Sequence, residues 1–427
     1  MNPTRPLGLW TSTALVVGNI VGMGIFLLPA SIAPLGLNAV FGWLITVVGC
    51  IAQALVFARL AKQRPKAEGP YDYLREAFGE APAFLAIWAY WVSMWVTTAG
   101  IAIGVTGYLD AVFPLLHRFH PGAVALALVW MLTALNLFGV KSGGVFQLAT
   151  TVLKLTPLFV LILLGLWLFA ARPESYSAPR TAVPLGISGI AAATSLSLFA
   201  MLGLESASLS AARVKDPERT IPRATAIGTL LTGAISLAVS TLPMFLLPTA
   251  ELENSGAPFA DVLNRYLAEG SGRWLALFIA ISGIGAINGW ILLTGEVTRV
   301  MSQRGEFPLR LSRLNRFASP RNALLFAAIL ASAMIGMSYS QSLVAGFTFL
   351  TNVTTLVTLP LYLGCTLALL RLWRKEPASR RPWMLPVCAI ALAFVACVLF
   401  GSSATPLVMA LGLALAGLPI FWLRRRV

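Results

Sequence analysis

The chain consists of apolar stretches, each about as long as a bilayer is thick, separated by short polar connections. A helix rises about 1.5 Å per residue, so about twenty apolar residues cross the roughly 30 Å of hydrocarbon in a bilayer. We therefore expect an all-α membrane protein in which residues 1–427 form a single transmembrane domain. The twelve expected spans are 9–33, 39–60, 82–113, 122–140, 146–170, 186–211, 224–248, 273–302, 322–340, 342–371, 384–401 and 403–423.

The composition agrees with this pattern. Hydrophobic residues make up 58% of the 427 residues and charged residues only 11%, whereas about a quarter of an average soluble domain is charged. The first apolar stretch, Leu7 to Pro34, is too long for a signal peptide and has no A-x-A-like cleavage site. We therefore expect it to remain in the protein as the first span.

The basic residues are distributed unevenly between the two sides of the predicted bundle. If the chain starts inside, 25 of the 31 lysines and arginines lie on the inner side. Under the positive-inside rule this bias places both termini in the cytoplasm, and we expect a bacterial cytoplasmic (inner) membrane. The net charge of +15 then reflects topology and contact with anionic membrane lipids, so it implies no nucleic-acid partner.

Two charged residues, Lys154 and Glu205, lie deep in predicted spans. A charge there costs at least about 2.5–3.5 kcal/mol, so each needs a partner or a function. Glu205 can bind a cationic substrate or carry a proton, or it can cap the amides of a broken helix. Lys154 can replace a coupling cation or titrate, or it can belong to a structural pair. Glu296 lies nearer a helix end, and an i,i+3 pair with Arg299 accounts for it.

Two spans contain signs of a helix break. Gly18, Gly22 and Gly24 fall within seven residues of the first span, and Gly203 adjoins Glu205 in the sixth. Glycine disfavours a helix by about 1 kcal/mol relative to alanine, although it also permits close helix packing. Breaks five spans apart are typical of two inverted five-helix repeats, here about 9–170 and 186–371, with further helices at about 384–423. Free N–H groups and carbonyls at such breaks suit a zwitterionic amino acid.

The cysteines and histidines show which cofactors and activities to expect. The four cysteines lie in apolar segments with no metal-site spacing, and both histidines, His117 and His120, lie in a predicted external loop. The chain also lacks a G-x-x-x-x-G-K-[ST] phosphate loop, so we expect no metal, nucleotide or redox cofactor and no enzymatic activity. A channel or an amine-sensing receptor remains an alternative to a carrier. Tyr90, Trp91 and Trp290 are candidates for core packing or for contact with a substrate.

Several motifs resemble the amino acid–polyamine–organocation superfamily, in particular its basic amino acid/polyamine antiporters, over nearly the whole chain. They are Gly18-Asn19-Ile20-Val21-Gly22-Met23-Gly24-Ile25-Phe26-Leu27-Leu28-Pro29-Ala30, Gly69-Pro70-Tyr71-Asp72-Tyr73, Gly203-Leu204-Glu205-Ser206-Ala207-Ser208 and the segment from Val214 to Ala224, with weaker support from Ala257-Pro258-Phe259 and Gly289-Trp290.

The resemblance implies a LeuT-like core of ten helices plus two more, a homodimer, and secondary active transport of an amino acid or amine by alternating access. It implies that the amides of Gly22, Met23 and Gly24 meet a substrate carboxylate. Asn19 and the backbone from Phe199 to Gly203 would then hold the amino group. Tyr90, Phe199 and Trp290 match aromatic gate positions, and Glu205 matches a carboxylate linked to substrate or proton.

Three residues depart from the arginine-exchanging members. Met23 replaces a small hydroxyl residue, Phe199 replaces tryptophan, and Lys154 is absent from those members. Lys154 instead resembles a lysine of sodium-independent, proton-coupled amino acid transporters. These departures leave two alternatives open: exchange of basic amino acids or polyamines, and exchange or proton-coupled transport of neutral amino acids.

Overall fold

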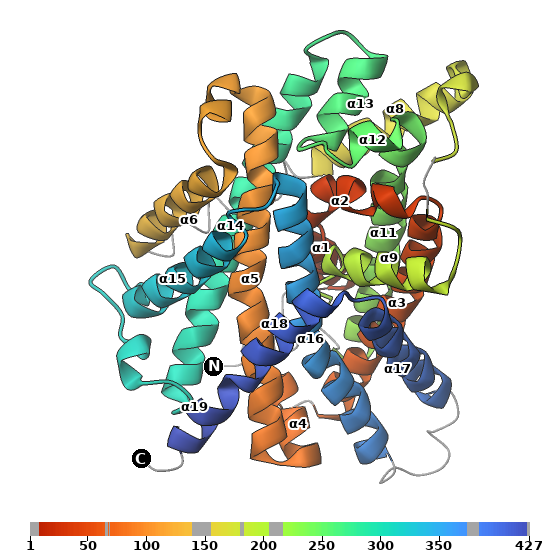
Figure 1. Cartoon of the computed structure of the whole chain (residues 1–427). Coiled ribbons are helices and arrows are strands. Elements are labelled where there is room, and N and C mark those ends of the chain that lie inside the picture. The colour runs from red at the N-terminus through yellow and green to blue at the C-terminus, as the bar shows by residue number, and fades with distance from the viewer. Residues whose placement is uncertain are drawn as a thin grey trace.

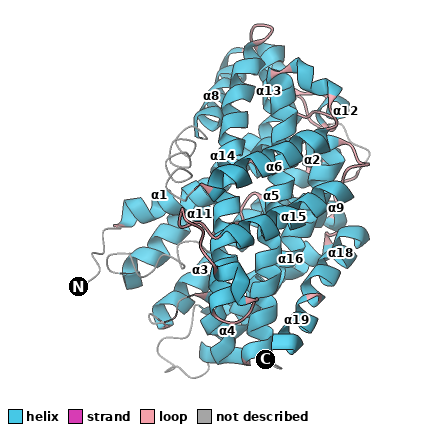
Figure 2. Cartoon of the chain, turned by 90° about the vertical axis from the view of Figure 1, so that its left-hand side faces the viewer, coloured by secondary structure: helices cyan, strands magenta, loops and turns pink. Residues whose placement is uncertain are grey.

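The structure, a computed structural model, describes residues 8–64, 67, 69–138, 155–179, 183–204, 217–373 and 384–424. Within these ranges the chain forms only helices, turns and loops, and no strand (Figure 2). The expectation of an all-helical protein is therefore confirmed.

Within the described residues, an apolar helix lies in each of the twelve predicted spans. Six are long enough to cross a membrane: α3 (Asn38–Gln63), α5 (Glu80–Val112), α11 (Pro217–Leu246), α14 (Ser271–Gln303), α16 (Leu343–Trp373), and the segment Ala404–Trp422 formed by α18 (Ala404–Leu415) and α19 (Gly417–Arg424). The shorter apolar helices are α2 (Gly24–Ile32), α6 (Pro121–Leu137), α8 (Leu155–Ala171), α9 (Ile187–Phe199), α15 (Arg321–Met337) and α17 (Met384–Phe400). In the first span, α1 (Leu9–Ile20) precedes α2.

The centre of the molecule is built around α5. This helix runs through the middle of the bundle beside α16 (Figure 1) and also packs against α14 and α15. On another side, α3 packs between α9 and α11, and α1 packs against α11. The last spans lie outside this core, with α17 against α3 and α18 against α16. The bundle thus surrounds the two segments in which the sequence predicts helix breaks.

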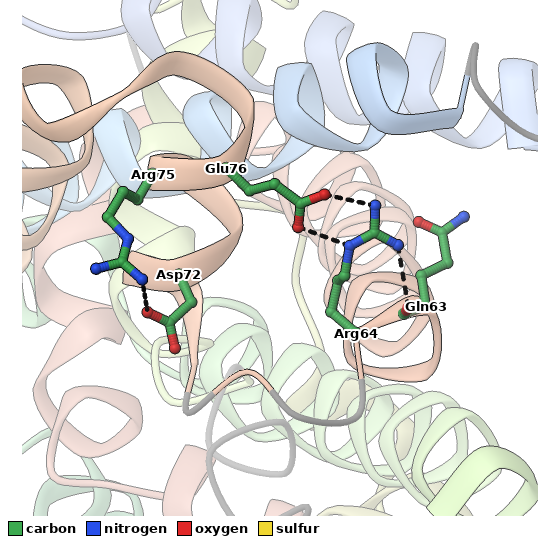
Figure 3. Close-up of polar contacts among 5 residues, drawn as sticks. All are labelled: Gln63, Arg64, Asp72, Arg75 and Glu76. Atoms are coloured by element: carbon green, nitrogen blue, oxygen red, sulfur yellow. Dashed lines mark hydrogen bonds and ion pairs between the residues drawn. The ribbon is translucent and has the colours of Figure 1, made fainter.

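Short helices connect the spans at both ends of the bundle. The connections contain α4 (Pro70–Phe78), α12 (Thr249–Leu252), α13 (Pro258–Tyr266), and the 3₁₀ turns η1 (Ala33–Leu35), η2 (Pro114–Arg118), η3 (Pro173–Ser175) and η5 (Leu309–Ser312). The helices α4 and α13 lie at opposite ends of the bundle (Figure 1). Beside α4, Arg64 donates hydrogen bonds of 2.6 and 2.7 Å to Glu76, and Arg75 lies 3.7 Å from Asp72 (Figure 3).

Three local predictions can be compared with this structure. The four cysteines are free thiols in apolar helices, and three of them are buried. Arg299 donates two hydrogen bonds to Glu296, which confirms the i,i+3 pair. Trp91 is a core residue: its ring packs against Trp88, Phe307 and Phe326, and its indole N–H donates to Thr298 at 2.7 Å.

Candidate functional site

The first span is broken where the glycines predict it. The chain leaves the helical conformation at Val21, which has φ −65° and ψ 103°, and it becomes helical again at Gly24. The N–H groups of Gly22 to Ile25 donate no backbone hydrogen bond within the described residues, and α2 has no side-chain cap. These free donors at a helix N-terminus form a suitable site for a carboxylate.

The sixth span is broken just after Phe199. From Ala200 to Leu202 each N–H bonds only three residues back, as in a 3₁₀ turn, and Gly203 then adopts φ 104°. This left-handed conformation strongly favours glycine. The carbonyls of Ala200, Met201 and Leu202 accept no backbone hydrogen bond from any described residue. They are therefore acceptors suited to an ammonium group.

The two breaks are in direct contact. A Cβ atom added to Gly24 would lie 2.8 Å from two ring carbons of Phe199 and 3.5 Å from the Cα of Ala200. The same ring meets Phe347 of α16 edge-on, with centroids 5.8 Å apart. The N–H groups of the first break and the carbonyl groups of the second therefore lie on neighbouring segments. The ring of Phe199 lies between these segments and α16.

The side chain of Met23 is packed rather than accessible. It is 1% exposed, and its sulfur lies 2.9 Å from where a Cβ of Gly283 in α14 would be. Val105 of α5 contacts the same position. Met23 therefore presents its backbone to the break, while its side chain joins the first span to α14.

On the α13 side of the breaks, the path is filled with side chains. Phe26 meets Phe259 of α13 with ring centroids 5.5 Å apart, and Tyr108 donates a 2.6 Å hydrogen bond to the carbonyl of Phe26. Thr348 of α16 donates to Ser31 of α2 at 2.7 Å. Burial raises the pKa of Asp261 in α13, and a hydrogen bond from Ser255 partly opposes this effect. This structure is therefore closed on the α13 side.

Tyr90 and Trp290 lie on the other side of the breaks, and both are half-buried. Trp290 is seven residues after Gly283, which corresponds to two helical turns, about 10 Å, on the same face of α14. Tyr90 is ten residues before Gly100, the glycine of α5 nearest the Phe199 ring. Of the three predicted aromatic residues, only Phe199 lies at the breaks, and the other two lie closer to the α4 end.

Sequence reasoning missed two rows of buried hydroxyl groups. Their hydroxyl oxygens have no hydrogen-bond partner among the described residues, whereas the hydroxyl groups of Thr97, Thr298 and Thr358 donate to the carbonyl four residues earlier. One row follows Phe347 on the same side of α16. The other row runs along α11 at spacings of three and four residues, and this spacing was visible in the sequence. The residues are Thr351, Thr354 and Thr355, and Thr225, Thr229, Thr232, Ser236 and Ser240.

Some predicted site residues cannot be placed in this geometry. Lys154 and Glu205 lie outside the described residues, and the side chain of Asn19 is likewise not described. The described stretch 183–204 ends one residue before Glu205. Among the described residues no group of three or more His, Cys, Asp or Glu side chains is placed to hold a metal ion.

Comparison with known proteins identifies the family of this chain and several relatives. The model of the amino acid permease family matches residues 7–419. The chain is 31% identical over 403 residues to the cadaverine/lysine antiporter of Escherichia coli (strain K12), covering 91% of this chain and 88% of the relative. It is 30% identical over 457 residues to a putative arginine/ornithine antiporter of Bacillus subtilis (strain 168), covering 99% and 97%. It is 28% identical over 361 residues to the putrescine transporter PotE of Escherichia coli (strain K12), covering 84% and 82%.

Proposed function

Because this chain belongs to the amino acid permease family and is a multi-pass secondary transporter, we propose that it exchanges basic amino acids or their diamines across the membrane. The observation that carries the proposal is the contact between Gly24 and Phe199, which brings together amides and carbonyls that form no backbone hydrogen bond among the described residues. The relatives are named as antiporters or transporters of molecules that all end in a cationic nitrogen group, an ammonium or, in arginine, a guanidinium. Transport, rather than enzymatic activity, agrees with the sequence prediction.

In this proposal each end of the substrate has its own partner. The carboxylate of an amino acid accepts hydrogen bonds from the amides of Gly22, Met23 and Gly24. Its α-ammonium group donates to the carbonyls that follow Phe199, with help from Asn19. A cationic amine is also attracted by Glu205, which follows Leu204 in the chain. Tyr90 and Trp290 then contact the substrate on its way toward the α4 end.

Neutral amino acids are the less favoured alternative. The replacement of a hydroxyl residue by Met23 raised this alternative, but the Met23 side chain is buried against Gly283. Hydroxyl groups are instead available on α16, where Thr351 and Thr354 follow Phe347 by one and two turns. The named relatives also favour exchange of cationic molecules.

The proposed mechanism uses two inverted repeats, about 9–170 and 186–371. The packing of the helices supports this division. In it α1 and α3 of the first repeat correspond to α9 and α11 of the second. The first helix of each repeat packs against the second helix of the other, α1 against α11 and α9 against α3. The short helices α4 and α13 are also counterparts: each begins with proline followed by an aromatic residue, at opposite ends of the bundle (Figure 1). Rocking of one repeat against the other would open the site to each side in turn.

We place both termini and the α4 end in the cytoplasm of a bacterial cell, with the protein in the cytoplasmic membrane. The bias of basic residues toward that end supports this orientation. A membrane-impermeant thiol reagent should then fail to label a cysteine introduced near either terminus in intact cells. Labelling from outside would reverse the orientation.

Lys154 is the residue that we propose takes the place of a coupling ion during transport. A fixed ammonium group in the fifth span can take the place of a coupling ion, because it holds a positive charge in a region of low dielectric. We expect Lys154→Ala to lower the rate of exchange more than the affinity for substrate. Substrate binding to the purified variant and counterflow in liposomes measure the two quantities separately, and an unchanged turnover would assign Lys154 to a structural pair.

Counterflow in proteoliposomes tests the proposed function. Vesicles would be loaded with lysine, arginine, ornithine, cadaverine, putrescine or neutral amino acids. Uptake of labelled lysine, and in parallel of a labelled neutral amino acid, would be measured with and without a pH gradient. We expect uptake only when a basic amino acid or a diamine is inside. Uptake driven by a pH gradient, with neutral amino acids as substrates and diamines inactive, would overturn the proposal. A channel would not accumulate label against its gradient.

A further inference from the structure

The connection between α14 and α15, residues 304–320, combines exposed arginines with exposed apolar side chains. Arg310, Arg313 and Arg316 are exposed, and each adjoins a large apolar residue that is also exposed. These neighbours are Leu309, Leu314 and Phe317, at 69%, 52% and 40% exposure. Arg304, at the start of the connection, and Arg321, the first residue of α15, are exposed as well. The only acidic residue in the connection, Glu306, is 3% exposed.

This connection is held in one conformation by its own hydrogen bonds. The Asn315 side-chain oxygen accepts from the N–H groups of Phe317 and Ser319, and its amide donates to the carbonyl of Leu137 in α6 at 2.7 Å. Ser319 donates to the carbonyl of Asn136 at 2.8 Å. Phe307 inserts among the aromatic rings of the core, including Trp91. The arginines are therefore displayed on a surface that is already ordered.

Four of these arginines have no acidic partner among the residues that the structure describes. Arg310, Arg313, Arg316 and Arg321 form no ion pair within the described ranges. Arg316 lies over the ring of Phe317, 4.6 Å from its centroid. By contrast, Arg64 and Arg75 near α4 are paired with Glu76 and Asp72 (Figure 3). A cluster of unpaired guanidinium groups attracts anions, and a phosphate accepts two parallel hydrogen bonds from one guanidinium.

Exposed apolar tips beside the arginines favour a phosphate at a membrane surface over one in solution. Phe317 also meets Phe138 at the end of α6, with centroids 5.8 Å apart, and Phe138 is 63% exposed. Apolar side chains alternating with cations suit the boundary where acyl chains meet headgroups. We propose that residues 304–321 form a binding surface for the headgroup phosphates of anionic phospholipids, with Leu309, Leu314 and Phe317 in contact with the acyl chains.

Binding of phosphatidylglycerol to the purified full-length protein tests this proposal by native mass spectrometry, with phosphatidylcholine of the same acyl chains as reference. Each basic residue near an anionic surface contributes about a fivefold change in affinity. We expect Arg313→Gln/Arg316→Gln to weaken phosphatidylglycerol binding about 25-fold and to leave phosphatidylcholine binding unchanged. The paired arginines supply the control: Arg64→Gln/Arg75→Gln also removes two charges but should change binding less than twofold.

The lysine variant Arg313→Lys/Arg316→Lys separates charge from folding, because it keeps both charges and should retain most of the binding. Equal phosphatidylglycerol binding by wild type and the glutamine variant would overturn the proposal. Parallel loss of phosphatidylcholine binding would also overturn it, since that result means unspecific apolar contact. Displacement of the lipid by millimolar inorganic phosphate would identify a site for free phosphate instead. None of these readouts depends on which substrate is exchanged.

Discussion

The variant Glu205→Gln is expected to lose nearly all exchange activity while the protein is produced in normal amount. Glutamine keeps the size of the side chain but removes the negative charge that attracts a cationic amine. Hydrogen bonds to charged groups contribute about 1.5–3 kcal/mol, which corresponds to roughly ten- to 150-fold in rate or affinity. The initial rate of lysine counterflow, at equal amounts of reconstituted protein and over a range of pH, measures the effect.

A matched control for this variant is Glu296→Gln. Glu296 is also a glutamate in a span, but it is largely exposed and paired with Arg299 one turn away. An exposed pair of this kind contributes little to stability, so we expect wild-type exchange from the control. Full activity of Glu205→Gln at every pH would remove Glu205 from the mechanism and leave it as a cap for the broken helix.

The variant Gly24→Ala is expected to lower exchange by roughly five- to 150-fold, because the added methyl group collides with the ring of Phe199. Overpacking of this kind costs about 1–3 kcal/mol, and here it opposes the contact between the two breaks. The ring has little room to move, because Phe347 and the backbone at Gly100 border it. Counterflow rate and thermal stability of the purified protein measure the two consequences.

A second substitution makes this prediction specific. In Gly24→Ala/Phe199→Leu the smaller side chain makes room for the methyl group, so we expect thermal stability to return most of the way to that of Phe199→Leu alone. Gly336→Ala is the control for glycine replacement as such, since no atom lies within 4 Å of its added Cβ. Wild-type exchange by Gly24→Ala would mean that the contact with Phe199 is not kept during transport.

The structure is closed between the two breaks and α13, and this closure bears on the expected effects of the variants. Tyr108, Phe26 and Phe259 fill the path between the breaks and α13, whereas half-buried Tyr90 and Trp290 lie toward the α4 end. An exchanger must leave this arrangement to receive substrate from the α13 side. Variants that alter the meeting point of the breaks therefore affect both halves of the cycle.

The apolar helices and the two positions at which they break could be predicted from the residues alone. Each depends on neighbouring residues: about twenty apolar residues cross a bilayer, and glycines close together weaken a helix. The pair Glu296–Arg299 was predictable for the same reason, because residues three apart share one helix face. The resemblance to antiporters also came from short local motifs, and the family match together with the named relatives confirms it.

The residues that the broken segments touch could not be predicted in this way, because those contacts form between helices. Gly24 and Phe199 are far apart in the sequence, and nothing local to either residue specifies their contact. Hydropathy likewise could not show that the Met23 side chain packs against Gly283, or that the hydroxyl groups of Thr351 and Thr354 remain without partners. Apolar periodicity reports that a side chain is buried, whereas its partner depends on how the helices are packed together.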